Sequence, residues 1–144
     1  MAVQTRLGMP LDEFIGEYDK SPFELVHGWR MPLPPRAAMH AVITSALFRL
    51  LHSAVDPLAE VWVHSPFVTL DPDGNVSEVF APSVSVYRSE RMTEYRRTNP
   101  NWKDKPLLIA PDCAAKIVGR EDLYLDVDSS VPGYLQRGVR LVWV

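Results

Sequence analysis

One long apolar segment constrains the fold of this chain more than any other feature. Residues 36–55, RAAMHAVITSALFRLLHSAV, repeat apolar side chains at i, i+3 and i+4, which predicts an amphipathic helix ending before Asp56-Pro57. We expect one face to pack on the core, namely Met39, Val42, Ile43, Ala46, Leu47, Leu50 and Leu51. His40 and Thr44 lie off that face, so His40 is predicted to be a surface or capping residue.

Shorter elements surround this helix. Residues 9–20 predict a first helix, and two apolar runs around His27-Gly28 predict a hairpin over residues 23–33. Residues 60–70, 76–80 and 82–87 alternate like the strands of an antiparallel meander, with a turn at 71–75. The remaining segments are expected as follows: irregular at 88–106, strand at 112–119, helix at 129–138 and strand at 139–144. This order predicts an α/β fold with a mixed sheet flanked by helices.

The bulk composition narrows the class of protein. A chain of 144 residues has the size of one domain, so residues 1–144 are taken as a single domain. The net charge of −3 provides no general attraction to a polyanion, so DNA binding would need a local basic patch. A single cysteine, Cys113, and the lack of a signal-like or membrane-length apolar run favour a cytoplasmic protein without membrane contact.

Three segments in a fixed order resemble one known family. They are FELVHGWRM (23–31), SPFVTLDPDGNVSEVFAPSVSVY (65–87) and YLQRGV (134–139) followed by Trp143. This pattern resembles the Uma-type restriction endonuclease family of the PD-(D/E)XK nuclease superfamily over roughly residues 10 to 143, with a C-terminus that is short relative to that family. The resemblance implies a restriction-endonuclease-like α/β/α sandwich with a mixed central sheet, and it implies a homodimer.

The resemblance also implies an active site, which this chain keeps only in part. Family members bind one or two divalent metals such as Mg²⁺ through carboxylates at adjacent strand ends. Glu24 matches the hairpin glutamate, and His40 matches an early helix histidine of accessory role. Asp112 follows a proline as in the family motif. However, three positions have changed: Ser83 replaces the metal-binding aspartate, Lys116 the catalytic glutamate, and Ser130 a helix lysine. In a register shifted by two residues, Lys116 would match the family lysine and Ala114 the acidic position, so either register loses the carboxylate.

These replacements predict a degenerate site centred on Glu24 and Lys116. A divalent ion needs anionic ligands to leave water, and a lysine ammonium at a ligand position repels it. We therefore expect no metal or other cofactor, and we expect the Lys116 ammonium to occupy the place of the metal and to pair with Glu24.

Three functions remain open at this stage. The first is a catalytically degenerate family member retained as a binding or assembly module. The second is an active Mg²⁺-dependent DNA endonuclease with a rearranged set, Glu24, Asp112 and Glu121. The third is a protein-interaction module without a nucleic-acid role.

Residues 87–105 are the candidate for DNA contact. Their cations alternate with aromatic side chains, a combination that holds phosphates and stacks on bases. Arg96, Arg97 and Lys103 are the predicted contact residues. The alternative for this segment is a charged surface loop or an arm that packs on a second subunit.

Overall fold

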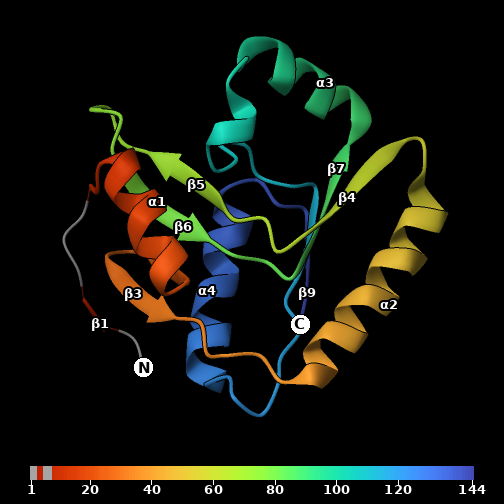
Figure 1. Ribbon diagram of the computed structural model, residues 1–144, viewed down its shortest axis with the longest axis horizontal. Coiled ribbons are helices and arrows are strands. Elements are labelled where there is room, and N and C mark those ends of the chain that lie inside the picture. The colour runs from red at the N-terminus through yellow and green to blue at the C-terminus, as the bar shows by residue number, and fades with distance from the viewer. Residues whose placement is uncertain (1–2, 5–7) are drawn as a thin grey trace.

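The three helices predicted from the sequence are present in the computed structural model, which also has a fourth helix over residues 89–98 and a short 3₁₀ turn (Figure 1). The structure describes residues 3–4 and 8–144. The expectation that the N-terminus carries no signal segment therefore falls partly on residues 1–2 and 5–7, outside the described residues. The helices are α1 (Leu11–Lys20), α2 (Ala38–Val55), α3 (Ser89–Thr98), α4 (Tyr124–Gln136) and a short 3₁₀ turn, η1 (Trp102–Asp104).

The strands form two sheets. One has the order β1-β3-β2-β6-β5 and is antiparallel, and the other has the order β4-β7-β8-β9, with β8 and β9 parallel. The strands of the first sheet are β1 (Val3–Gln4), β2 (Phe23–Val26), β3 (Trp29–Pro32), β5 (Phe67–Leu70) and β6 (Val76–Phe80). Those of the second are β4 (Ala59–Val63), β7 (Val84–Arg88), β8 (Cys113–Ala115) and β9 (Leu141–Trp143). The α/β class with a mixed sheet is confirmed.

The expected meander over residues 60–87 is wrong, because the chain changes sheet twice within it. β4 pairs with β7, whereas β5 and β6 pair with each other in the other sheet. Proline has no N–H to continue a ladder, and Pro66 and Pro82 lie in these two crossings. Ser83 lies at the second crossing, where its N–H donates to Ala115 O at 2.8 Å and its carbonyl accepts from His64 N–H at 3.0 Å.

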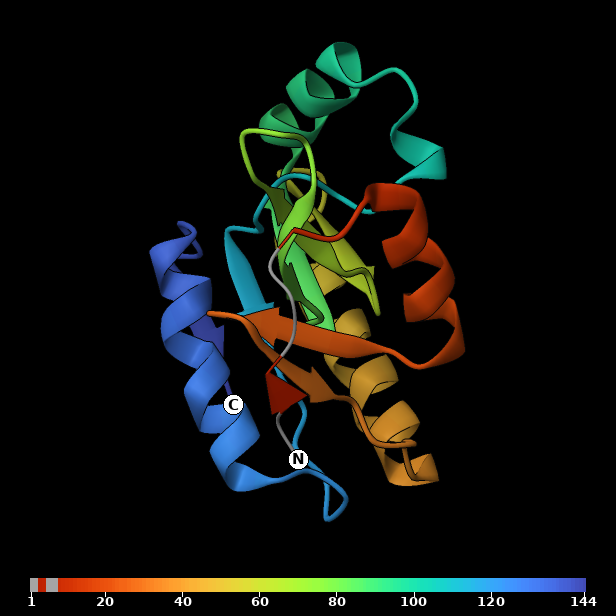
Figure 2. The same cartoon turned by 90° about the vertical axis from the view of Figure 1, so that its left-hand side faces the viewer.

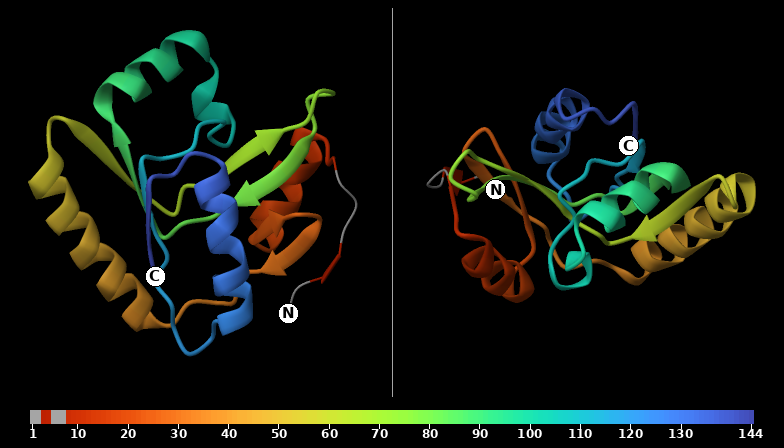
Figure 3. Two further views of the ribbon diagram at one scale, coloured as in Figure 1. Left: turned by 180° about the vertical axis from the view of Figure 1, so that it is seen from behind. Right: turned by 90° about the horizontal axis from the view of Figure 1, so that it is seen from above.

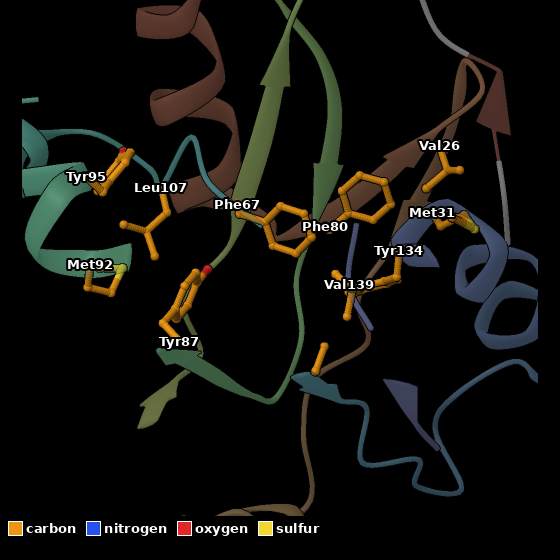
Figure 4. Close-up of a cluster of buried hydrophobic side chains, with 11 residues drawn as sticks. Val26, Met31, Phe67, Phe80, Tyr87, Met92, Tyr95, Leu107, Tyr134 and Val139 are labelled. Carbon is orange, nitrogen blue, oxygen red and sulfur yellow. The ribbon is translucent and has the colours of Figure 1, made fainter. Parts of the chain in front are cut away.

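Helices cover both faces of the hairpin strands. Figure 2 shows α1 and α4 on opposite sides of the strands. All four residues of β2 are therefore buried, and alternation along the strand places Phe23 and Leu25 in the cluster under α1. Val26 belongs to the larger cluster, in which Phe67, Phe80 and Tyr134 lie close together (Figure 4). Glu24 lies on this second side, facing α4.

The predicted packing face of α2 is wrong. Met39, Val42, Ile43 and Leu50 are 63%, 60%, 43% and 70% exposed, whereas His40 and Thr44 are 5% and 4% exposed. Apolar side chains surround most of this helix, so periodicity alone could not select the buried face. The helix is long and apolar enough to cross a membrane by length and composition, with a mean hydropathy of 1.3 and 11% of its residues buried. That finding corrects the expectation that no run has this character, although a helix of a soluble protein can pass the same test.

Two further segments differ from expectation. Residues 89–98, predicted to be irregular, form α3, which buries Met92 and Tyr95 at i, i+3 spacing. α4 starts five residues earlier than predicted and continues through Pro132. A Cβ on Gly133 would lie 2.8 Å from the Phe80 ring, so this glycine lets α4 approach β6 closely.

Candidate functional site

A buried carboxylate occupies the junction between the two sheets. Glu24 is 3% exposed, and its Oε2 accepts the Tyr134 hydroxyl at 2.6 Å and the Ala81 N–H at 3.1 Å. The three residues come from β2, α4 and the segment between the sheets. A buried carboxylate needs such donors, because desolvation without them costs several kcal/mol.

Lys116 supplies the opposite charge. Its Nζ contacts Glu24 Oε1, and the lysine is 9% exposed. Its backbone N–H donates to Trp143 O at 2.8 Å, which fixes the residue at the end of β8. The ammonium also lies 5.3 Å from the centre of the Tyr134 ring. The contact expected between Glu24 and Lys116 is thus present.

Tyr134 was missed as a site residue, although its motif carried part of the family resemblance. The side chain is fully buried, and burial together with the nearby Glu24 carboxylate raises the pKa of its hydroxyl well above the usual value of 10. Tyr134 therefore remains a hydrogen-bond donor to Glu24. A buried tyrosine needs a partner for its hydroxyl, which is the signal that could have drawn attention to it.

Ser83 contacts a histidine rather than the carboxylate. Its Oγ accepts the Ile117 N–H at 3.1 Å and lies 3.4 Å from His40 Nε2. His40 Nδ1 lies 3.4 Å from the Thr44 hydroxyl, and its ring stacks on His64. Burial, followed by the Arg36 and His64 charges, lowers the pKa of His40 below its usual value of 6.5. The prediction of a surface or capping role for His40 is therefore wrong.

Ser130 does not join this group. It is fully buried in α4, and its hydroxyl donates to Val127 O at 2.9 Å within its own helix. Among the described residues, the hydroxyls of Ser83 and Ser130 bond to groups other than the Glu24–Lys116 pair.

A cavity of about 160 Å³ opens beside the pair. Glu24, Ser83 and Lys116 line it together with a second charged group, Arg36, Glu121 and Asp122. Arg36 Nη1 lies 2.6 Å from Asp122 Oδ2 and 3.8 Å from Glu121 Oε1. The cavity has room for several water molecules, so space would not exclude a small ion.

Asp112 lies away from this cavity. It precedes β8, whereas Lys116 follows it, so the two positions are separated by roughly 13 Å of extended chain. Burial raises the pKa of Asp112, but the Arg88 N–H and the Arg91 guanidinium outweigh it and hold that pKa below its usual value. The structure does not bring Asp112 together with Glu24 and Glu121.

The candidate DNA contacts lie on α3 and η1, apart from the cavity. Arg96 makes two hydrogen bonds with Glu60, at 2.8 and 2.6 Å, and lies 4.9 Å from the centre of the Trp102 ring. Arg97 pairs with Glu94 at 2.6 and 2.9 Å, and Lys103 lies 5.8 Å from the Trp102 ring. Both arginines are thus paired with carboxylates of this chain.

The donor set at the junction does not fit the divalent metal that such a fold implies. Both oxygens of Glu24 are used by protein donors, and the nearest charged group is an ammonium. In the part of the chain that the structure describes, no group of three or more His, Cys, Asp or Glu side chains could hold a metal ion. We therefore derive no metal-dependent step from this site.

Comparison with known proteins supports the architecture. No family model matches the chain, and no curated protein matches it. Among solved structures, it is similar to the crystal structure of a putative nuclease belonging to DUF820 from Anabaena variabilis, with a TM-score of 0.69 and 21% identity, covering 94% of this chain and 72% of that one. The chain has a nuclease-like α/β fold. At this identity the likeness establishes the fold and leaves the chemistry to the residues described above.

Proposed function

We propose that this protein is a catalytically degenerate member of a restriction-endonuclease-like family, retained as a binding or assembly module and acting as a homodimer. The observation that carries the proposal is the buried Glu24–Lys116 pair, completed by the Tyr134 hydroxyl. A hydrolytic metal site would need these donors to leave Glu24 and a second carboxylate to replace the ammonium.

A plasmid-cleavage assay with Mg²⁺ or Mn²⁺ tests this proposal. The wild-type protein is expected to cleave no more DNA than the Glu24→Gln variant prepared in the same way. Calorimetric titration with either metal is expected to give no heat of specific binding. Metal-dependent cleavage that is lost in a Glu24→Gln sample shown by circular dichroism to be folded would establish the active endonuclease instead.

A variant in which the carboxylates are restored provides a gain-of-function test that complements the cleavage assay. The double variant Ser83→Asp/Lys116→Glu would add two carboxylates beside Glu24 in a cavity that Glu121 and Asp122 also line. We expect it to gain a Mn²⁺-dependent increase in melting temperature, because a ligand that binds only the folded state stabilises it. The matched control is Ser83→Asn/Lys116→Gln, which has nearly the same shape and no added charge. Equal responses of the two variants would show that charge is not what excludes the metal.

The proposed DNA contact through α3 and η1 is supported by the mixture of cationic and aromatic residues there. The two arginines are paired with carboxylates of this chain. Arg96 and Arg97 would have to exchange Glu60 and Glu94 for phosphates. Binding to duplex DNA, measured by fluorescence anisotropy, is expected to weaken steeply with salt and to weaken further in Arg97→Ala and Lys103→Ala. An affinity for DNA that changes neither with salt concentration nor in these variants would favour the protein-interaction module.

A further inference from the structure

Two exposed apolar surfaces remain without a partner among the described residues. The first, called the α2 stripe, consists of Met39, Val42, Ile43 and Leu50, which are 43–70% exposed. These residues follow the i, i+3, i+4 rule over about three turns, or roughly 16 Å of helix. The orientation of α2 against β4 and β7 comes from His40 and Thr44, so the stripe does not contribute to the core.

The second surface is a groove between the β2–β3 hairpin and the start of α4, called the α4 groove. It has a volume of about 820 Å³. Its most exposed apolar lining residues are Trp29, Leu123, Tyr124 and Leu125, at 48%, 52%, 75% and 77%. Figure 3 shows that α2 and the α4–β3 region lie on different sides of the molecule, so neither surface covers the other.

The charges on the two surfaces are complementary. α2 itself contains one arginine, Arg49, and no Asp or Glu, because Arg36 precedes the helix and pairs with Asp122. Among the described residues, the lining of the α4 groove includes the carboxylate of Asp128 and no Lys or Arg. An apolar helix that carries a cation and no carboxylate is complementary to an apolar groove that carries an acidic residue.

We propose that the α2 stripe of one copy docks in the α4 groove of a second copy of this chain. Both halves of the contact are present in one polypeptide, and each exposes four large, mainly apolar side chains. A two-fold axis would use the contact twice and so double the buried area. Pairing of two α2 stripes is disfavoured, because it would bring the Arg49 side chains of two helices without acidic residues together.

This inference gives structural detail to the assembly role proposed above, but it does not depend on the loss of catalysis. Neither surface contains Glu24, Lys116 or Ser83. The α4 groove adjoins the cavity beside Glu24 only near the start of α4. An active nuclease could assemble in the same way. The cleavage assay and the association assay can therefore fail independently.

A mixing experiment tests the contact. Leu50→Glu blocks the stripe and Tyr124→Ser/Leu125→Ser blocks the groove, and all three positions are at least 70% exposed, which protects the fold. Light scattering over a concentration series is expected to show self-association of the wild type. Each blocked variant should associate at least ten-fold more weakly, as the loss of a central apolar anchor predicts.

The decisive sample is an equimolar mixture of the two blocked variants. It retains one intact stripe and one intact groove on different copies, so it should form a two-copy complex that neither variant forms alone. Leu135→Ser, a 51% exposed residue on α4 outside both surfaces, is the matched control and should associate like the wild type.

Three outcomes would overturn the inference. A wild-type protein that remains monomeric at all concentrations has no such contact. Loss of association only in Leu50→Glu, without recovery on mixing, would indicate stripe-to-stripe pairing. Binding of a monomer to phosphatidylserine vesicles, lost in Leu50→Glu, would assign the stripe to a membrane surface.

Discussion

Two ion pairs in this protein have similar chemistry and different surroundings. The side chains of Lys116 and Glu24 are 9% and 4% exposed, whereas those of Arg96 and Glu60 are 32% and 29% exposed. The first pair lies between two sheets and shares its carboxylate with the Tyr134 hydroxyl, and the second lies beside the Trp102 ring at the surface. Water and salt can therefore replace the partners of Arg96, but they cannot readily replace those of Lys116.

This difference in exposure separates the charges that are available for ligand binding from those that are not. A buried pair is held together because either charge alone would be desolvated without compensation, so it contributes little to ligand binding. An exposed pair contributes little to stability and can exchange its partner for a phosphate. Charged residues that look equally functional in a sequence thus separate into a structural group and an accessible group.

The largest expected effect comes from breaking the buried pair on one side. Glu24→Gln leaves the Lys116 ammonium buried without a counter-charge, which should lower the free energy of unfolding by about 3–5 kcal/mol. Urea denaturation at neutral pH measures this change. The double variant Glu24→Gln/Lys116→Met removes both charges and keeps an oxygen acceptor for Tyr134, so it should recover most of the loss. A single variant that is as stable as the wild type would show that water reaches the pair.

A smaller loss is expected when only the hydroxyl of Tyr134 is removed. Tyr134→Phe keeps the ring packed on Phe67 and Phe80 but leaves Glu24 Oε2 without its 2.6 Å donor. We expect a decrease of about 1–3 kcal/mol in the free energy of unfolding, as for a buried acceptor that loses a partner. Tyr87→Phe is the control, because its hydroxyl donates to the Ile109 carbonyl and not to a charge. It should cost less than Tyr134→Phe.

The stability of the fold should depend on pH through the buried side chain of His40. Burial lowers the pKa of His40 below 6.5, so the unfolded state takes up a proton at a higher pH than the folded state does. The contribution of His40 to stability is therefore complete above pH 6.5 and decreases as the pH falls through the folded pKa. Melting temperatures measured between pH 7.5 and 5 should decline less in His40→Gln than in the wild type. Parallel curves would show that His40 accepts a proton equally well in both states.

Short sequence patterns correctly predicted the β2–β3 hairpin and α1. The hairpin follows from His27-Gly28, both of which adopt positive φ, and α1 follows from Pro10 and the acidic first turn. The pairing of Glu24 with Lys116 was expected because the charge at a family metal position had changed sign. The hairpin and α1 thus follow from residue type and spacing alone, whereas the Glu24–Lys116 pair follows from the family resemblance.

The remaining features depend on contacts between distant segments. His40 is buried because Ser83, from another element, lies beside its ring nitrogen, and no helical period encodes that neighbour. Tyr134 reaches Glu24 because Gly133 lets α4 approach Phe80. The separation of β4–β7 from β5–β6 depends on where the chain changes sheet, which alternation cannot reveal.

The smallest effects are expected for the exposed pairs, and salt should separate them from the buried one. Arg96→Ala removes a two-bond contact with Glu60 and its stacking on Trp102, which should cost up to about 1 kcal/mol at low salt. Arg97→Ala should leave the melting temperature unchanged, because the side chains of Arg97 and Glu94 are 69% and 61% exposed. Adding molar NaCl should reduce the effect of Arg96→Ala while the effect of Glu24→Gln persists, since salt screens exposed charges far more than buried ones. Equal sensitivity of both variants to salt would mean that solvent reaches the two pairs alike, and the distinction between a structural and an accessible group of charges would then not hold.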